Sequence, residues 1–315
     1  MMTNAPALPL SLDAISWVGH GLVRPECVVV GPDGTLYTAD WRGGVASIAP
    51  SGDVTLLKAE VGDGGPPLQP NGIARLSDGS FLLADLSDAR AGVWHLAPDG
   101  RATPFLRSLG GAPLPPANFV LVDAEGRVWI TFSTRMAPRA LDYRPDANSG
   151  FVVLVDGDSA RIVADGLGYA NECRLSPDGH HLYVNETFGR CTTRFRVTAG
   201  NDLVERETVA TYGPGTFPDG LDFDRRGRLW VTSIVSNRVL CLEPDGTVQT
   251  ILEDTDPSRL AEIEDAFQNG TMGRPHLDTV HSRTLRSISS IAFDGDRAYL
   301  GCLLGDAIAT FRLPD

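Results

Sequence analysis

The 315-residue sequence has no apolar run that approaches the ~18 residues of a membrane-spanning helix. Basic residues are also few, because 27 Lys and Arg stand against 40 Asp and Glu and give a net charge of −13. Nucleic-acid affinity comes mainly from Lys and Arg that neutralise phosphates, and the same negative charge repels anionic membrane surfaces. The composition therefore disfavours nucleic acid and membranes as partners.

Cysteine is sparse as well. The five cysteines are an odd number, lie far apart and form no Cys-x-x-Cys pair. This pattern disfavours a disulfide framework or a zinc site and predicts buried free thiols in a reducing compartment. The first ten residues have neither a basic start nor an unbroken apolar core, so we expect a cytoplasmic protein. No Gly-x-Ser-x-Gly motif is present, which leaves a serine hydrolase of the α/β type without support.

A repeat dominates what is present. Each copy has a polar residue, a short apolar run and a tight turn, and in five copies the polar residue stands eight positions before a Gly. A sixth, shorter copy is aligned on Phe293. The six polar positions are Glu26, Asn71, Asn118, Asn171, Asp219 and Ser289. Their spacings of 45, 47, 53, 48 and 70 residues mostly match the ~40–50 residues of a four-stranded propeller blade. The sequence therefore predicts an all-β, six-bladed propeller with four-stranded antiparallel blades, as a single domain over residues 1–315.

Three segments fall outside this rhythm. Residues 12–23 are partly apolar, and we expect them to form an outer strand that pairs with the last blade and removes an open sheet edge. Residues 133–149 form a polar insertion in blade three. Residues 253–286 lie before the last blade and include a short helix predicted over 257–267. Long insertions in a compact fold are usually functional or disordered, so the second insertion is a candidate lid.

The six polar positions predict a ring, because the first strand of every blade lines the central channel. Two buried carboxylates, Glu26 and Asp219, together with several amides would be unfavourable in one small volume unless a positive group lay between them. All the donors are oxygen atoms, which favours a hard cation, calcium above all, over zinc. A simpler interpretation stays open, in which these residues are Asx-type turn residues at strand ends.

Four ring residues lie in local motifs: Pro-Glu at 25–26, Asn118, Asn171 with Pro-Asp-Gly at 177–179, and Phe-Pro-Asp-Gly at 217–220. This ordered set resembles the senescence marker protein/regucalcin/gluconolactonase family of six-bladed propellers. The resemblance implies one divalent ion, calcium or else Mg²⁺, Mn²⁺ or Zn²⁺, bound by Glu26, Asn171 and Asp219, with Asn118 as a fourth ligand or a catalytic substrate contact. It also implies hydrolysis of a small lactone or ester, in which the metal polarises the carbonyl and Asp219 acts as general base or nucleophile.

The pocket itself is expected to be apolar. Sugar-lactonase relatives carry an Arg two residues before the position of Asn118, where this chain has Pro116, and Phe119 follows the Asn. A less polar lactone or ester is therefore the expected substrate, with Arg135 or Arg139 of the first insertion as possible replacements for the missing Arg. The candidate substrate contacts are Asn71, Phe119, Tyr169, Phe217, Ser289 and His281.

Two other functions remain open. Strictosidine synthases share the propeller and catalyse a condensation, but they do not rely on such a ring of metal ligands. A non-catalytic scaffold could use the propeller face to bind another protein. Whatever the function, we expect a monomer or a small homo-oligomer.

Overall fold

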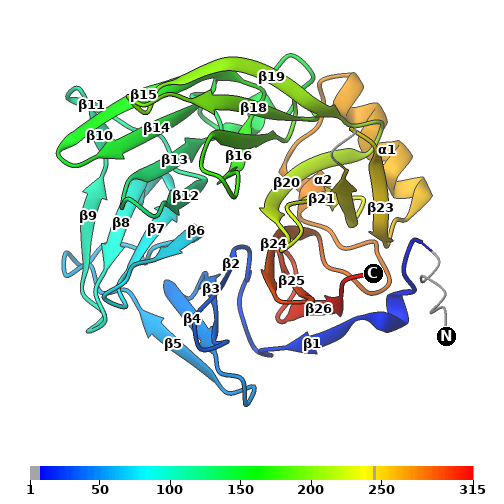
Figure 1. The fold of residues 1–315 in the computed structure, drawn as a ribbon, viewed down its shortest axis with the longest axis horizontal. Coiled ribbons are helices and arrows are strands. Elements are labelled where there is room, and N and C mark those ends of the chain that lie inside the picture. Colours follow the sequence, from blue (N-terminus) through cyan, green and yellow to red (C-terminus); the bar gives the residue numbers. More distant parts are fainter. Residues whose placement is uncertain (1–7, 244–245, 315) are drawn as a thin grey trace.

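The computed structural model describes residues 8–243 and 246–314. In this part of the chain, six four-stranded antiparallel sheets surround a common axis as the blades of a propeller (Figure 1). Blades one to three contain β2 (Val28–Val30), β3 (Leu36–Asp40), β4 (Gly44–Ile48), β5 (Val54–Lys58), β6 (Pro70–Arg75), β7 (Phe81–Asp85), β8 (Gly92–Leu96), β9 (Ala102–Leu106), β12 (Phe119–Val122), β13 (Val128–Phe132), β14 (Gly150–Asp156) and β15 (Ser159–Leu167). The prediction of six four-stranded blades is confirmed.

The other three blades complete the ring. Blades four to six contain β16 (Ala170–Leu175), β17 (His181–Glu186), β18 (Cys191–Val197), β19 (Leu203–Thr211), β20 (Thr216–Phe223), β21 (Leu229–Val235), β22 (Arg238–Leu242), β23 (Val248–Glu253), β24 (Ile288–Asp294), β25 (Arg297–Cys302), β26 (Ile308–Arg312) and β1 (Ser16–Val18). The remaining short elements are η1 (Leu12–Ala14), η2 (Asp88–Arg90), β10 (Ser108–Leu109) and β11 (Ala112–Pro113). The predicted closure is confirmed, since β1 pairs antiparallel with β26 at the outer edge of blade six.

The repeated Asp-Gly turns explain why each hairpin forms where it does. In blade one the Asp33 carboxylate accepts a hydrogen bond from the Thr35 N–H at 3.1 Å, and Gly34 has a φ of 81°. Asp178 and Gly179 repeat this arrangement in blade four. Because a positive φ strongly favours Gly, the repeat fixes the turn between the first two strands of the blade.

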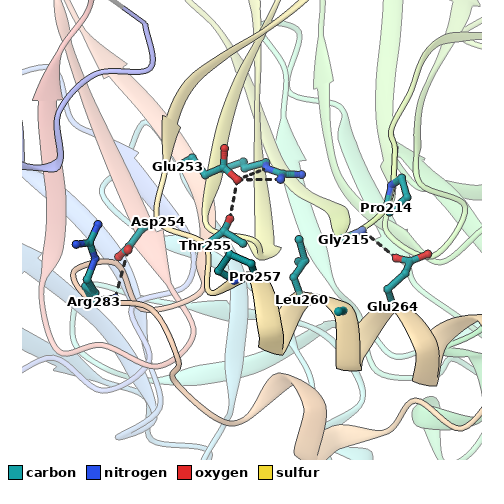
Figure 2. A pocket seen from close by; sticks show the side chains of 11 residues that line it. Pro214, Gly215, Glu253, Asp254, Thr255, Pro257, Leu260, Glu264 and Arg283 are labelled. Carbon is teal, nitrogen blue, oxygen red and sulfur yellow. Dashed lines mark hydrogen bonds and ion pairs between the residues drawn. The ribbon is translucent and has the colours of Figure 1, made fainter.

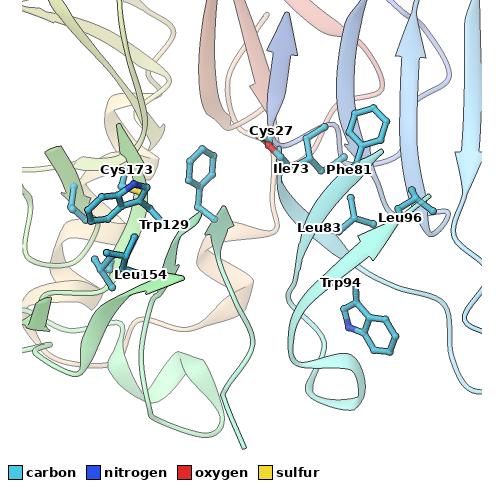
Figure 3. Packing of buried hydrophobic residues seen from close by; sticks show 14 of the residues in the cluster. Cys27, Ile73, Phe81, Leu83, Trp94, Leu96, Trp129, Leu154 and Cys173 are labelled. Atoms are coloured by element: carbon cyan, nitrogen blue, oxygen red, sulfur yellow. Dashed lines mark hydrogen bonds between the residues drawn. The ribbon is translucent and has the colours of Figure 1, made fainter. Parts of the chain in front are cut away.

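Hydrophobic side chains pack between neighbouring blades. One cluster runs from blade one to blade four and includes the buried Ile73, Trp94 and Trp129 (Figure 3). Cysteines contribute to this packing: all five are free, and four are buried. Cys191 is partly exposed, so the prediction of buried thiols does not hold for that residue. This packing between blades leaves the axis to the polar ring.

The two insertions both fold. The first carries a short helical turn, η3 (Arg139–Asp142), between β13 and β14. The second forms α1 (Pro257–Gln268), as predicted, and α2 (Arg274–Leu277). Helix α1 begins at an Asp256 cap that accepts hydrogen bonds from two backbone N–H groups, and it buries Ile263, Ala266 and Phe267. These spacings place one apolar face toward the blades.

Irregular pairing occurs at the ring. The register shifts lie between Pro70 and Ile73 in β6, Ala170 and Cys173 in β16, Pro218 and Leu221 in β20, and Ile288 and Ile291 in β24. Each bulge spans a predicted ring residue. Bulges re-aim side chains and are frequent beside functional sites, so the backbone departs from regular pairing where the ring residues lie.

Candidate metal centre

Six of the predicted site residues surround one cavity near the axis. The cavity has a volume of about 40 Å³ and is lined by Glu26, Asn71, Asn118, Tyr169, Asn171 and Asp219, among others. These residues come from or directly precede the innermost strands of blades one to five. A cavity of this size holds no more than a few water molecules or an ion.

The asparagine side chains are fixed so that their oxygen atoms have no protein partner. Asn71 Nδ2 donates to the Asn118 carbonyl at 3.1 Å, and Asn171 Nδ2 donates to Thr187 Oγ1 at 2.9 Å. Thr187 Oγ1 in turn donates to the Pro218 carbonyl at 2.8 Å. The Oδ1 atoms of Asn71, Asn118 and Asn171 are buried without a hydrogen-bond partner. Buried polar atoms are normally satisfied, and three exceptions around one cavity indicate a ligand.

The two carboxylates are equally buried, with Glu26 5% and Asp219 3% exposed. Burial raises the pKa of the Asp219 carboxyl well above its usual range, and the negative charges of Glu26 and Glu172 add to this effect. Arg24 and a hydrogen bond from Asn171 oppose it. Burial also raises the pKa of Glu172 to about 8, against the opposing effect of Arg174. Without a nearby cation, Asp219 is therefore a carboxyl group that resists ionisation.

This set of atoms fits a hard divalent cation. Glu26 and Asp219 supply two negative charges, and the amide oxygens are the neutral donors that calcium accepts with loose geometry. No group of three or more His, Cys, Asp and Glu side chains in the described part of the chain is arranged to bind a metal. The fit therefore depends on the Asn oxygens. Arg24 Nη2 lies 3.2 Å from Glu26 Oε2 and would compete for this oxygen.

An aromatic cluster closes the cavity above the ring. Tyr143 of the first insertion contacts Tyr169, with ring centroids 5.4 Å apart, and Phe188, at 4.6 Å. Phe267 of α1 lies 6.0 Å from Phe188. Tyr169 has a φ of 71°, an uncommon conformation for a bulky residue. Both insertions thus meet over the ring and restrict access to it.

Four predicted substrate contacts lie outside this cavity. Phe119 belongs to the core between the blades, and Phe217 packs in the aromatic cluster, with its ring centroid 5.2 Å from that of Phe267. Ser289 Oγ donates to the Glu26 carbonyl at 2.9 Å and so joins blade six to blade one. His281 lines a different, smaller cavity of about 20 Å³ together with His276. None of these four side chains lines the ring cavity.

Three arginines at the cavity were not predicted as site residues, although Arg139 was considered as a replacement donor. They are Arg24, Arg139 and Arg274. The expected pocket with few donors is therefore not what the structure shows, because the insertions fold back over the axis and bring Arg139 and Arg274 with them. Arg139 and Arg274 lie outside every repeat copy, so the periodicity gave no indication of them, whereas Arg24 directly precedes the first copy. Arg135 lies elsewhere and pairs with Asp165 at 2.8 Å.

Two larger hollows lie near the ring cavity or beside α1. A cleft of about 550 Å³ shares Arg24, Arg274 and Leu303 with the ring cavity and is therefore adjacent to it. A hollow of about 510 Å³ lies beside α1, where Glu264 accepts from the Gly215 N–H (Figure 2). No ring residue lines the second hollow, so we do not assign it to the metal centre.

Among the described residues, no helix is long and apolar enough to cross a membrane. A six-bladed propeller with carboxylate and amide oxygens converging at its axis defines the class of this protein. The family described as SMP-30/Gluconolactonase/LRE-like region matches residues 59–255, which is more than half of the chain. The chain therefore belongs to this family, and the predicted resemblance is confirmed.

Solved structures agree with the fold. A gluconolactonase from Xanthomonas campestris aligns over 94% of this chain and 89% of its own, with 21% identity and a TM-score of 0.68. A calcium-binding regucalcin from Agrobacterium tumefaciens aligns over 95% of this chain and 94% of its own, with 17% identity and a TM-score of 0.65. At these identities the likeness concerns the fold.

A curated relative carries the name of a different enzyme. The strictosidine synthase-like 6 protein of Arabidopsis thaliana is 26% identical over 230 residues, or 70% of this chain. The match covers 59% of that protein, so the chain spans about three fifths of its length. The similarity is distant.

Proposed function

We propose that this protein is a metal-dependent lactonase or related esterase whose active site is the ring cavity. The observation that carries the proposal is the convergence of buried, unpartnered oxygens of Asn71, Asn118 and Asn171 with the carboxylates of Glu26 and Asp219. Glu26, Asn171 and Asp219 would hold the ion, with Asn118 as a further ligand or a substrate contact. A bound divalent cation, for which calcium matches these oxygen donors best, would polarise the substrate carbonyl.

Asp219 is the residue suited to move a proton or attack the carbonyl. Its carboxylate is buried, and burial raises its pKa, which makes it a stronger base when ionised. Asn185 Nδ2 donates to the backbone carbonyls of Asp219 and Gly220 at 3.1 and 3.0 Å, which anchors this bulged segment. Asp219 is therefore held by its backbone while its side chain faces the cavity.

Substrate entry requires movement of the side chains that cover the ring cavity. The cavity of about 40 Å³ is too small for a lactone ring, and the wider cleft lies beyond Arg24, Arg274 and Leu303. Displacement of the α2 segment would join the two spaces, because Arg274 and Leu277 belong to α2 and line the cavity. We therefore propose that the second insertion acts as a lid.

The test is a hydrolysis assay with a panel of γ- and δ-lactones and aryl esters, before and after removal of metal with a chelator. We expect activity that chelation abolishes and that added calcium, Mg²⁺, Mn²⁺ or Zn²⁺ restores to different degrees, with metal content measured on the same samples. Hydrolysis that persists after complete metal removal would contradict metal dependence. Absence of hydrolysis at every metal loading would contradict the proposed activity.

The distant strictosidine synthase-like relatives support a condensation as the second candidate. That reaction is a condensation and does not rely on a ring of metal ligands. A condensation assay on the same chelated samples separates the two functions, since only the second candidate would remain active without metal.

A further inference from the structure

Arg139 occupies an unusual position in the ring cavity. It begins η3 in the blade-three insertion and lines the cavity together with Glu26 and Asp219. Its guanidinium lies 5.6 Å from the centre of the Tyr169 ring. A residue outside the propeller repeat thus brings a positive charge to the axis.

Arg139 forms no ion pair in the described part of the chain. Arg24 pairs with Glu26 at 3.2 Å and Arg274 with Asp278 at 2.7 Å, whereas no Asp or Glu lies within 4.0 Å of Arg139. Its Nη2 makes a long hydrogen bond of 3.3 Å to Ser133 Oγ, and its Nε is buried without a partner. A guanidinium held in this way is unfavourable unless a ligand completes its hydrogen bonds.

The acidic residue nearest in the same insertion does not neutralise it. Asp142 Oδ2 accepts a hydrogen bond from Ser149 Oγ at 2.8 Å and is buried there. Arg135, by contrast, lies only four residues earlier and forms a two-pronged ion pair with Asp165 at 2.8 and 3.0 Å. The insertion therefore pairs Arg135 with Asp165 and Arg144 with Asp146, and leaves Arg139 facing the cavity.

The charge balance leads to the same conclusion. Once a divalent cation neutralises Glu26 and Asp219, and Asp278 neutralises Arg274, the positive charges of Arg24 and Arg139 remain. A neutral lactone would leave both without an anion, while a carboxylate offers the two oxygens that a guanidinium binds with a matching fork of N–H groups.

We propose that Arg139 is a specificity-determining residue and that the substrate is a lactone or ester bearing a carboxylate, which Arg139 binds. This inference rests on the proposed hydrolase function. It replaces the expectation of an apolar substrate and assigns no new step to the reaction.

The experiment compares two γ-lactones that differ only in a ring substituent, a carboxylate in one and its primary amide in the other. We expect wild-type protein to have the higher kcat/KM for the carboxylate. In Arg139→Gln the carboxylate-to-amide ratio of kcat/KM should fall about 30-fold or more, the effect of removing one partner of a buried charge pair. Arg139→Lys should recover part of the ratio, and the matched control Arg135→Gln should leave it unchanged.

A binding measurement keeps the inference testable if no lactone is hydrolysed. The dicarboxylate formed by opening the carboxylate lactone should raise the Tm of calcium-loaded wild-type protein, and Arg139→Gln should abolish this rise while Arg135→Gln retains it. Loss of hydrolysis with retention of this binding pattern would refute the proposed lactonase but support the anion site. Equal binding by wild type and Arg139→Gln, or a preference for the amide lactone, would overturn the role of Arg139.

Discussion

Replacement of Asp219 by Asn should change stability in opposite directions with and without metal. In the metal-free protein, Asp219 is 3% exposed and lies near Glu26 and Glu172, which raise its pKa in addition to burial. The substitution removes a carboxyl group whose ionised form is unfavourable at this buried site, and it keeps an oxygen donor. It should therefore stabilise the metal-free protein, while metal binding loses one of its two carboxylates.

The magnitudes follow from the size of the chain. For 315 residues the entropy of unfolding is about 0.66 kcal/mol/K at ~2.1 cal/mol/K per residue. If Asp219→Asn removes the ~1–3 kcal/mol that burial of this carboxyl group costs in the metal-free protein, the Tm should rise by about 2–5 °C. Calcium at a thousand times its Kd adds ~4.1 kcal/mol to the wild type, or about 6 °C. A variant that binds ~100-fold more weakly gains only about 2 °C at the same calcium concentration.

The assay is a thermal melt with chelator and with calcium, together with lactone turnover. Asp222→Asn is the matched control, because Asp222 lies in the same strand but pairs with Arg174 at 3.2 Å. Asp222→Asn should lower the Tm relative to wild type by the same amount with chelator and with calcium. Turnover by Asp219→Asn should fall by ~10²–10⁴ for loss of a general base. A wild-type calcium shift in Asp219→Asn would refute its role as a ligand, and wild-type turnover would refute its role in the reaction.

Two further predictions concern the lid and the spacing of the ring. Burial raises the pKa of Glu264 in α1, but hydrogen bonds from Arg190, Gln268 and the Gly215 N–H outweigh burial and lower this pKa from 4.5 to about 2. The contribution of Glu264 to the stability of the folded protein is therefore present above about pH 4.5 and is lost as the pH falls toward 2. Glu264→Gln should therefore lower the Tm by about 2–5 °C at pH 7 and much less near pH 2. The control Glu262→Gln, which breaks a solvent-exposed ion pair of the same helix, should change the Tm by under ~1 °C. An equal effect of the two variants would contradict the idea that Glu264 holds the proposed lid in place through Arg190 and the Gly215 N–H. Gly301→Ala would place a Cβ against the Glu26 carbonyl oxygen, so we expect ~1–3 kcal/mol of destabilisation in denaturant melts and weaker calcium binding. The control Gly213→Ala, which has open space around the new Cβ, should cost ~0.5 kcal/mol or less. Unchanged calcium affinity in Gly301→Ala would show that the Glu26 backbone tolerates displacement.

The blades and much of the ring were predictable because both depend on local sequence. A polar residue eight positions before a turn Gly places the side chain at the start of an inner strand, whatever the rest of the blade contains. Asn71, Asn118 and Asn171 consequently share the cavity with Glu26 and Asp219. The bulges that turn several of these side chains were not predictable, since the repeat contains no residue that distinguishes a bulge from regular pairing.

Ser289 shows where the repeat becomes insufficient. It was assigned by aligning a shorter copy, and the bulge of β24 does lie at this position. The short hydroxyl nevertheless donates to the Glu26 carbonyl, because a backbone acceptor of the neighbouring blade lies within reach. Register can therefore be read from the sequence, but the partner of a short polar side chain depends on the packing of adjacent blades.

The insertions explain the rest of the difference between expectation and structure. Arg139 and Tyr143 come from the first insertion, and Arg274 and Leu277 come from the second, yet all four line one cavity. Their positions depend on tertiary contacts such as the packing of Tyr143 on Phe188, which no local pattern records. The ring is confined by hydrogen bonds between blades, so it can vary little, whereas the insertions can change the charge above it without disturbing a blade. Substrate preference in this chain should therefore follow the insertions, and a comparison of ring residues alone would miss it.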